Sequence, residues 1–149
     1  PEPQRGIFRQ KVIEILKEKE LTLVILEGNP AGSSTTTASG KIISYNHLPA
    51  NEMQRILSGS DAIIARPGYS TIMELISLNK TALLVPTPGQ SEQEYLAEYL
   101  SSKGWFTAVL QKNLGYGIDL PAEKAVWTRE IADESAGLLE KALDELLNQ

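Results

Sequence analysis

The chain has 149 residues, of which 42% are hydrophobic and 22% are charged, and its net charge is −5 at pH 7. This composition is typical of a soluble globular protein, so we expect residues 1–149 to form a single domain. The negative charge argues against binding to nucleic acid, and the absence of cysteine excludes disulfides, thiol nucleophiles and zinc–thiolate sites. With no apolar run near the ~20 residues of a membrane-spanning helix and no visible signal peptide, the sequence predicts a cytoplasmic protein.

Helical and strand-like patterns alternate along the chain. In order, the predicted elements are a helix over residues 4–19, a strand over 21–26, a Gly/Ser/Thr-rich loop over 28–40, a strand over 41–45, a helix capped by Asn51 that ends near Ser58, a strand over 61–66, a helix over 70–78, a strand over 81–85, a helix over 91–103, an edge strand over 105–110, an irregular segment over 111–130 and an amphipathic helix from about Asp133. This alternation predicts a doubly wound, Rossmann-like α/β fold, with a parallel sheet and helices on both faces.

The start of the chain departs from the usual start of such a fold. The first residue is Pro1 rather than Met, and the first predicted element is a helix where a strand is usual. We therefore expect the chain to be a fragment whose sheet lacks its first strand. The alternative is a fold without that strand, in which Pro1–Arg5 is an ordinary terminus.

Two strand-to-helix junctions stand out between Asp61 and Gln93. The first strand ends in residues 66–68 (Arg-Pro-Gly) before a helix, and the second ends in residues 86–89 (Pro-Thr-Pro-Gly) before another. Neighbouring parallel strands bring such junctions to one edge of the sheet, where helix N-termini offer free N–H groups and a positive dipole end. The sequence therefore predicts an anion-binding crevice at this edge.

The spacing of residues in these junctions resembles that of a known family. The matching positions are Asp61, Arg66, Gly68, Thr71, Glu74, Pro86, Glu92, Gln93 and Ala97. They resemble the C-terminal, nucleotide-sugar-binding domain of GT-B glycosyltransferases of the family 28 type, the group that includes the peptidoglycan-precursor N-acetylglucosaminyltransferase. The resemblance covers about residues 41–110. Leu96 departs from it, because the family often has Asn there, and the family's glycine-rich loop would lie before Pro1.

The resemblance implies a UDP-binding role for the first junction. Gly68 is expected to let the backbone approach the diphosphate, whose oxygens would bind the N–H groups of Tyr69, Ser70 and Thr71. The Glu74 carboxylate is expected to accept both ribose hydroxyls. The alternative for Glu74 is a capping box, because the spacing of Thr71 and Glu74 also fits a helix start.

The second junction is expected to bind the donor sugar. In the resembling proteins, the positions of Gln90, Glu92 and Gln93 hydrogen-bond sugar hydroxyls, a task suited to short carboxylate and amide groups. The alternative for Glu92 is structural, because an acidic residue near a helix start is favourable to the helix dipole.

Two further groups complete the predicted site. Backbone groups of Asn46, His47 and Leu48 are expected to read the uracil edge, which places the one histidine near the nucleotide base and not in acid–base work. Arg66 and Arg5 are candidate diphosphate ligands; a guanidinium at the start of a helix opposes the dipole, and a bound anion would relieve that conflict. The alternatives are a solvated Arg66 at a strand end and an Arg5 free at the terminus.

The resemblance implies the donor-binding domain of an inverting glycosyltransferase. Such an enzyme transfers a hexosyl group, here expected to be N-acetylglucosaminyl from a UDP-sugar, by direct displacement at the anomeric carbon. The acceptor site and the general base would belong to a missing N-terminal domain. We therefore expect no catalytic residue, metal or cofactor in this chain, negligible activity of the chain alone, and membrane association only through the missing part.

Two other functions stay open. The chain could be a stand-alone nucleotide-sugar-binding subunit that needs a separate acceptor subunit. It could also be a nucleotide-sugar epimerase or hydrolase of similar fold. The last function requires acid–base pairs within the domain, and the sequence shows none.

Overall fold

The computed structural model describes residues 3–17, 19–28, 36–115 and 118–121 of the chain. In chain order, its elements are α1 (Gln4–Leu16), β1 (Leu23–Leu26), β2 (Thr36–Ser39), β3 (Ile42–Tyr45), α2 (Ala50–Gly59), β4 (Ile64–Ala65), α3 (Tyr69–Ser77), β5 (Leu83–Leu84), α4 (Ser91–Ser102), β6 (Thr107–Ala108) and the 3-10 helix η1 (Gln111–Asn113). The amphipathic helix predicted from Asp133 lies outside the described residues, as does most of the segment predicted to be irregular over 111–130.

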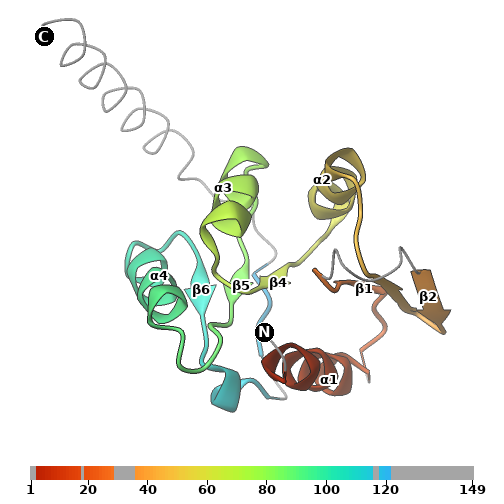
Figure 1. The fold of residues 1–149 in the computed structure, drawn as a ribbon, viewed down its shortest axis with the longest axis horizontal. Helices are drawn as coiled ribbons and strands as arrows, with labels where there is room; N and C mark the ends of the chain where they lie inside the picture. Colours follow the sequence, from red (N-terminus) through yellow and green to blue (C-terminus); the bar gives the residue numbers. More distant parts are fainter. Residues whose placement is uncertain (1–2, 18, 29–35, 116–117, 122–149) are drawn as a thin grey trace, which may run out of the picture.

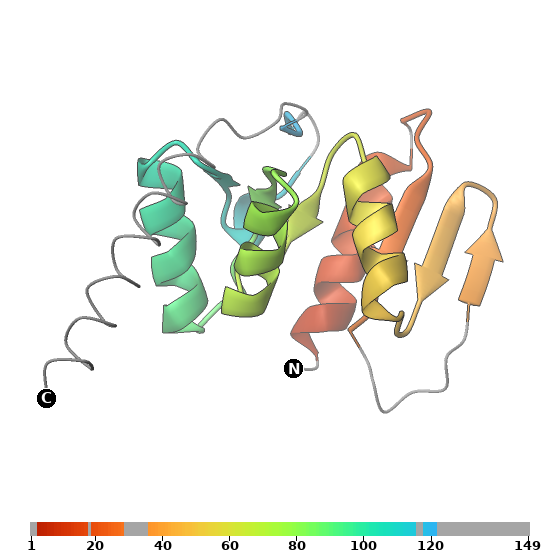
Figure 2. The same cartoon turned by 90° about the horizontal axis from the view of Figure 1, so that it is seen from above.

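The strands form two three-stranded sheets, in the orders β1-β3-β2 and β4-β5-β6. β1 pairs with β3, β4 with β5, and β5 with β6, each time in parallel. Helices cover both sides of these strands: α1 lies on one side, and α2 and α3 lie on the other (Figures 1 and 2). The predicted α/β architecture of parallel strands between helices is therefore confirmed, although the described strands form two sheets instead of one.

Helix α1 packs against strands of both sheets. Its buried residues Val12 and Ile15 belong to one apolar cluster with Leu83 of β5. Leu23 of β1 and Ile64 of β4 pack against the same cluster. The predicted first helix thus supplies a shared apolar contact between the two sheets.

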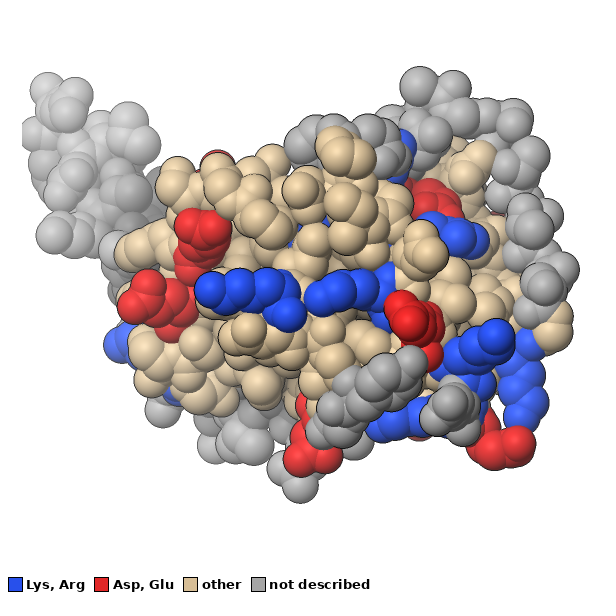
Figure 3. Space-filling model, turned by 90° about the horizontal axis from the view of Figure 1, so that it is seen from below, with Lys and Arg blue, Asp and Glu red and all other residues tan. Residues whose placement is uncertain are grey.

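The face that carries α1 has mixed charge. In Figure 3, basic (blue) and acidic (red) side chains of the described residues lie beside one another. An ion pair ties α1 to the first sheet, because Arg9 donates from Nε to Glu27 Oε1 at 2.7 Å and from Nη2 to Ser44 Oγ at 3.3 Å. Glu27 follows β1 and Ser44 lies in β3.

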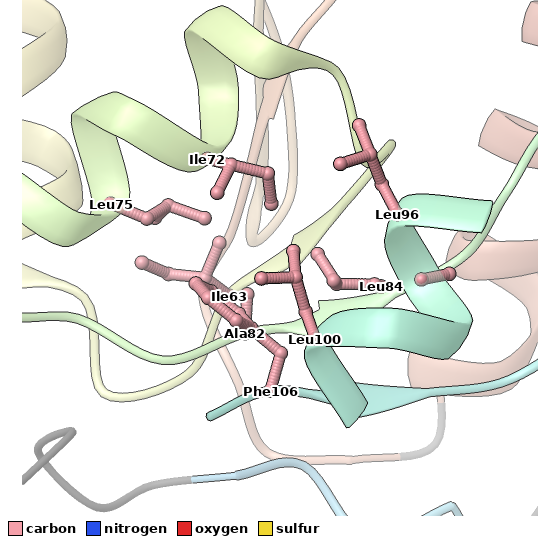
Figure 4. Close-up of a cluster of buried hydrophobic side chains, with 9 residues drawn as sticks. Ile63, Ile72, Leu75, Ala82, Leu84, Leu96, Leu100 and Phe106 are labelled. Carbon is pink, nitrogen blue, oxygen red and sulfur yellow. The ribbon is translucent and has the colours of Figure 1, made fainter. Parts of the chain in front are cut away.

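β5 lies at the centre of the core because its side chains alternate between two apolar layers. Leu84 belongs to the layer on the side of α3 and α4, together with Ile72 and Leu96 (Figure 4). Leu83 and Val85 belong to the layer under α1. Leu83, Leu84 and Val85, the residue that follows β5, are each at most 1% exposed. This two-sided burial accounts for the continuous apolar run that predicted the strand.

The prediction of a loop over residues 28–40 is wrong at its C-terminal end, where residues 36–39 form β2. β2 pairs antiparallel with β3, with Ser39 opposite Ile42, so only Gly40 and Lys41 connect the two strands. Gly40 has φ +62°, which suits the first position of a two-residue hairpin turn. The prediction was wrong because small polar residues are typical of loops, and it did not consider that Gly40 could begin a hairpin turn.

Several boundaries also differ from the prediction. α2 begins at Ala50 after Pro49, and Asn51 lies inside the helix and is not its cap. The strands predicted over 61–66, 81–85 and 105–110 shrink to two paired residues each. Their flanking apolar residues still contribute single backbone bonds, as Val85 N does to Ala65 O at 2.9 Å. Apolar runs therefore marked burial correctly but overestimated the length of the ladder.

Candidate functional site

The two junctions identified in the sequence lie at the same edge of the second sheet. β4 leads through residues 66–68 into α3, and β5 leads through residues 85–90 into α4. β4 and β5 run parallel, with Ala65 opposite Leu84. Helices α3 and α4 therefore both begin at the carboxyl ends of neighbouring strands, as the sequence predicted.

The start of α3 offers unused backbone donors. Gly68 is the N-cap residue, and the first helical bond runs from Ile72 N to Gly68 O at 2.9 Å. Within the described part of the chain, the N–H groups of Tyr69, Ser70 and Thr71 donate no hydrogen bond. No acidic residue lies in this first turn to offset the positive end of the dipole. The start of α3 is therefore suited to an anionic ligand.

The capping-box alternative for Glu74 is wrong. Thr71 is the third residue of α3, whereas a capping box requires it to precede the helix, and no side chain of the described residues caps this terminus. The Glu74 side chain is half-buried and has no hydrogen-bonding partner among the described residues. Its carboxylate is therefore available to a ligand, and its predicted contact with ribose stays a prediction.

Gly68 does not adopt a conformation that only glycine allows. Its φ is −97°, and a Cβ built on it would meet only Thr71 Oγ1, at 4.0 Å. The free protein thus has room for an alanine here. The described contacts of the fold therefore do not require a glycine at this position, and its predicted role in admitting a diphosphate stays a prediction.

The second junction is a tight turn. Gln90 N donates to Thr87 O at 3.1 Å, Pro88 occupies the second position, and Gly89 the third with φ +78°. These features define a type II turn, in which a glycine is favoured at the third position. The Pro/Gly signal in the sequence therefore marked a real turn at the predicted place.

Side chains of α4 reach back and hold this turn. Gln93 Oε1 accepts from Thr87 N at 2.9 Å, and Glu94 Oε1 accepts from Gly89 N at 3.1 Å. Glu94 was missed by the sequence reasoning, although a carboxylate near a helix start is a known signal of capping. Of the residues predicted to bind the sugar, Gln93 uses its Oε1 for the bond from Thr87 N and has no bond from its amide N–H groups among the described residues, while Glu92 and Gln90 have no side-chain hydrogen bond among them.

Arg66 bonds internally at both terminal nitrogens. Nη1 donates to Val85 O at 2.8 Å and to Pro86 O at 2.9 Å, and Nη2 donates to Gln4 O at 3.3 Å and to Gln111 Oε1. The guanidinium lies 4.1 Å from the centroid of the Phe8 ring. Burial lowers the pKa of Arg66. Its predicted contact with diphosphate stays a prediction, and the alternative of a merely solvated arginine is wrong.

The other predicted site residues lie at the start of α1 and after β3. Arg5 is half-buried in the first turn of α1, next to the Gln4 carbonyl that accepts from Arg66. Asn46 and Leu48 are half-buried and His47 is exposed, in the turn that follows β3 of the first sheet. The Arg66 contacts thus bring the start of α1 to both junctions, whereas residues 46–48 belong to the neighbouring sheet.

Other kinds of site are not formed by the residues that the structure describes. No group of three or more His, Cys, Asp or Glu among them could hold a metal ion. None of their helices has the length and apolarity needed to cross a membrane. A small hollow beside α1 is lined, among the described residues, by aliphatic side chains alone, so they offer a nucleotide no polar side chain; these are Val12, Ile15, Leu16, Ile64, Leu114, Ile118 and Leu120.

The chain matches a protein-family model and several curated proteins. The model is described as the glycosyltransferase family 28 C-terminal domain, and it matches residues 7–126. A UDP-N-acetylglucosamine--N-acetylmuramyl-(pentapeptide) pyrophosphoryl-undecaprenol N-acetylglucosamine transferase from Desulforudis audaxviator is 37% identical over 97 residues, which cover 63% of this chain and 25% of the relative.

Proteins of the same description from two other organisms are also similar. The Bacillus cytotoxicus protein is 31% identical over 110 residues, which cover 72% of this chain and 25% of the relative. The Caldicellulosiruptor saccharolyticus protein is 33% identical over 88 residues, which cover 58% and 23%. The chain therefore spans about a quarter of the length of these relatives. No solved structure matches the chain significantly.

Proposed function

Because the chain belongs to the family of glycosyltransferase family 28 C-terminal domains, we propose that it binds the nucleotide-sugar donor of a UDP-sugar-dependent glycosyltransferase. The relatives named above carry UDP-N-acetylglucosamine and an N-acetylglucosamine transfer in their names. The donor proposed for this chain is accordingly UDP-N-acetylglucosamine.

One observation carries the proposal: a helix start and a carboxylate that both lack a side-chain partner among the described residues lie within one turn of each other. The three free N–H groups of residues 69–71 and the dipole of α3 suit a diphosphate. Glu74 follows one turn later, and its unpaired carboxylate suits the two hydroxyls of a ribose. A nucleoside diphosphate presents both chemical groups together, which a simple anion does not.

The remaining parts of the donor are proposed for the neighbouring segments. The donor sugar would contact Gln90, Glu92 and the amide N–H groups of Gln93, all at the start of α4. The uracil would contact backbone groups of residues 46–48. Arg5, in the first turn of α1, would face the diphosphate.

The proposed contribution of this domain to catalysis is electrostatic. Direct displacement at the anomeric carbon expels UDP, and negative charge grows on the diphosphate as the bond breaks. Helix-terminal N–H groups that bind this charge lower the barrier more than they stabilise the bound donor. The acceptor and the general base are proposed to lie in another domain, so this chain alone would have negligible activity and need neither cofactor nor metal. The enzyme is proposed to act in the cytoplasm, with any membrane contact made by that other domain.

Calorimetric titration of the 149-residue chain with UDP, UDP-N-acetylglucosamine, GDP and TDP tests the proposal. We expect UDP and UDP-N-acetylglucosamine to bind, and GDP to bind at least about tenfold more weakly because the uracil contacts are lost. TDP lacks the ribose 2′-hydroxyl and should also bind about tenfold more weakly, since one bond to a carboxylate disappears. Absence of UDP binding, or equal binding of all four ligands, would contradict the proposal.

A further inference from the structure

We propose that Gln111, acting through Arg66, is a positioning residue for the diphosphate. This inference rests on the proposed function and adds a residue that neither the sequence motifs nor the resemblance assigned. Gln111 is the first residue of η1, far along the chain from both junctions, and it is 8% exposed.

The Gln111 side chain is held in one orientation. Its Nε2 donates to Gln4 Oε1 at 3.0 Å, and its Oε1 accepts from Arg66 Nη2. Its backbone carbonyl also accepts from Lys11 Nζ at 2.9 Å. Because the amide has partners at both its donor and its acceptor end, it fixes the position of Arg66 relative to the start of α1.

Arg66 extends this link to both junctions. It lies two residues before the N-cap of α3, and its Nη1 donates to Val85 O and Pro86 O in the segment that leads into α4. Its Nη2 also donates to the carbonyl of Gln4, the first residue of α1. The Arg66 guanidinium therefore connects the starts of three helices. Its donors are planar and forked, so they fix the relative geometry of these helix starts.

The geometry of these helix starts decides how well they bind a diphosphate. N–H groups bind an oxygen well only over a narrow range of distance and angle. A ligand that contacts several helix starts loses affinity when one of them moves, even if every contact residue is intact. Without the Gln111 amide, Arg66 Nη2 and the Gln4 side chain lose the partner that they share. The starts of α1, α3 and α4 then lose one restraint on their relative positions.

The test compares UDP with uridine, because only UDP carries the diphosphate. We expect Gln111→Met to lower the affinity for UDP about tenfold, because the helix starts that bind the diphosphate lose a restraint on their relative positions, and to change the affinity for uridine less than about twofold. The matched control is Thr81→Val, which removes a hydrogen bond from Thr81 Oγ1 to Trp105 O, 3.0 Å long, before the start of β5. This control should lose thermal stability without changing the ratio of the two affinities.

Two further variants keep the inference falsifiable. Gln111→Glu retains an acceptor for Arg66 but loses the donor to Gln4 Oε1, so its UDP affinity should lie between that of Gln111→Met and that of the unmodified chain. Should Gln111→Met not fold, Gln4→Ala removes the acceptor of the Gln111 amide and should lower the affinity for UDP but not for uridine.

The outcomes separate this inference from the proposed function. If the unmodified chain binds UDP and the Gln111 and Gln4 variants bind it equally well, the inference is wrong while the proposed function stands. A parallel loss of UDP and uridine affinity would also overturn it, since the residue would then support the whole fold. If the unmodified chain binds neither ligand, the proposed function fails and the inference falls with it.

Discussion

The starts of α3 and α4 look alike in the sequence but differ in how their polar groups are used. The turn before α4 is held by side chains of its own helix, Gln93 and Glu94, and the first turn of α4 carries the carboxylates of Glu92 and Glu94. The turn before α3 receives no side chain from α3, and its first turn has no acidic residue. Of these two helix starts, only that of α3 leaves its dipole uncompensated.

This difference favours different ligands at the two helix starts. A diphosphate is attracted to the start of α3 and repelled by the carboxylates at the start of α4. A neutral sugar with many hydroxyls is not repelled, and carboxylate and amide groups bind hydroxyls well. The arrangement proposed above, with the diphosphate at the start of α3 and the sugar at the start of α4, is therefore supported by charge as well as by the family resemblance.

The largest expected effect is that of Glu74→Ala, at the first of these helix starts. It should lower the affinity for UDP about a hundredfold, because two hydrogen bonds to a charged group are lost. The free energy of unfolding should change by less than about 0.5 kcal/mol, because the carboxylate has no partner among the described residues. Calorimetric titration and thermal denaturation measure the two quantities.

Glu98→Ala is the matched control for that variant. Glu98 is an exposed residue of α4, well beyond the first turn of that helix. It should change neither the affinity for UDP nor the stability. A loss of stability without a loss of affinity in Glu74→Ala would assign Glu74 a structural role and remove the distinction between the two helix starts.

Gln93 tests the second helix start, where a side chain already has a structural bond. Gln93→Leu should lower the free energy of unfolding by about 1–3 kcal/mol, because Thr87, 5% exposed, loses the acceptor of its N–H group. Gln93→Glu keeps that acceptor, so its stability should stay near that of the unmodified chain.

The same pair of variants separates sugar binding from turn formation. Gln93→Glu lacks the amide N–H groups, so it should bind UDP normally and UDP-N-acetylglucosamine several-fold more weakly. If Gln93→Glu binds both ligands like the unmodified chain, Gln93 only holds the turn and does not contact the sugar.

A smaller effect is expected for Gly68→Ala at the start of α3. The added Cβ has room in the free protein, so the free energy of unfolding should change by less than about 0.5 kcal/mol. The methyl group would project where the diphosphate approaches the backbone, and the affinity for UDP should fall about tenfold. Gly59→Ala, in the last turn of α2 with open space around its Cβ position, is the control. An unchanged UDP affinity in Gly68→Ala would place the diphosphate elsewhere.

Local signals explain which parts of this site the sequence could predict. The starts of α3 and α4 were predicted within one residue, because Gly68 and Gly89 mark the ends of apolar runs. β2 was missed, because its composition is that of a loop and its pairing with β3 is a tertiary feature. Contacts between Arg66 and Gln111 join residues 45 positions apart, and no local pattern announces them. Periodicity therefore located the helix starts, while the side chains that hold them required the three-dimensional arrangement.

The smallest expected effect is that of Gly89→Ala, the counterpart of Gly68→Ala at the second helix start. Gly89 has φ +78°, which an alanine adopts only at a cost of about 1 kcal/mol, so stability should fall by that amount. Space is open around its Cβ position, and Gly89 N already donates to Glu94, so UDP affinity should change less than about twofold. The two glycines are thus expected to respond in opposite ways: Gly68→Ala loses affinity and keeps stability, whereas Gly89→Ala loses stability and keeps affinity. Equal responses in both measurements would show that the two helix starts do not differ in the way their charges and hydrogen bonds indicate.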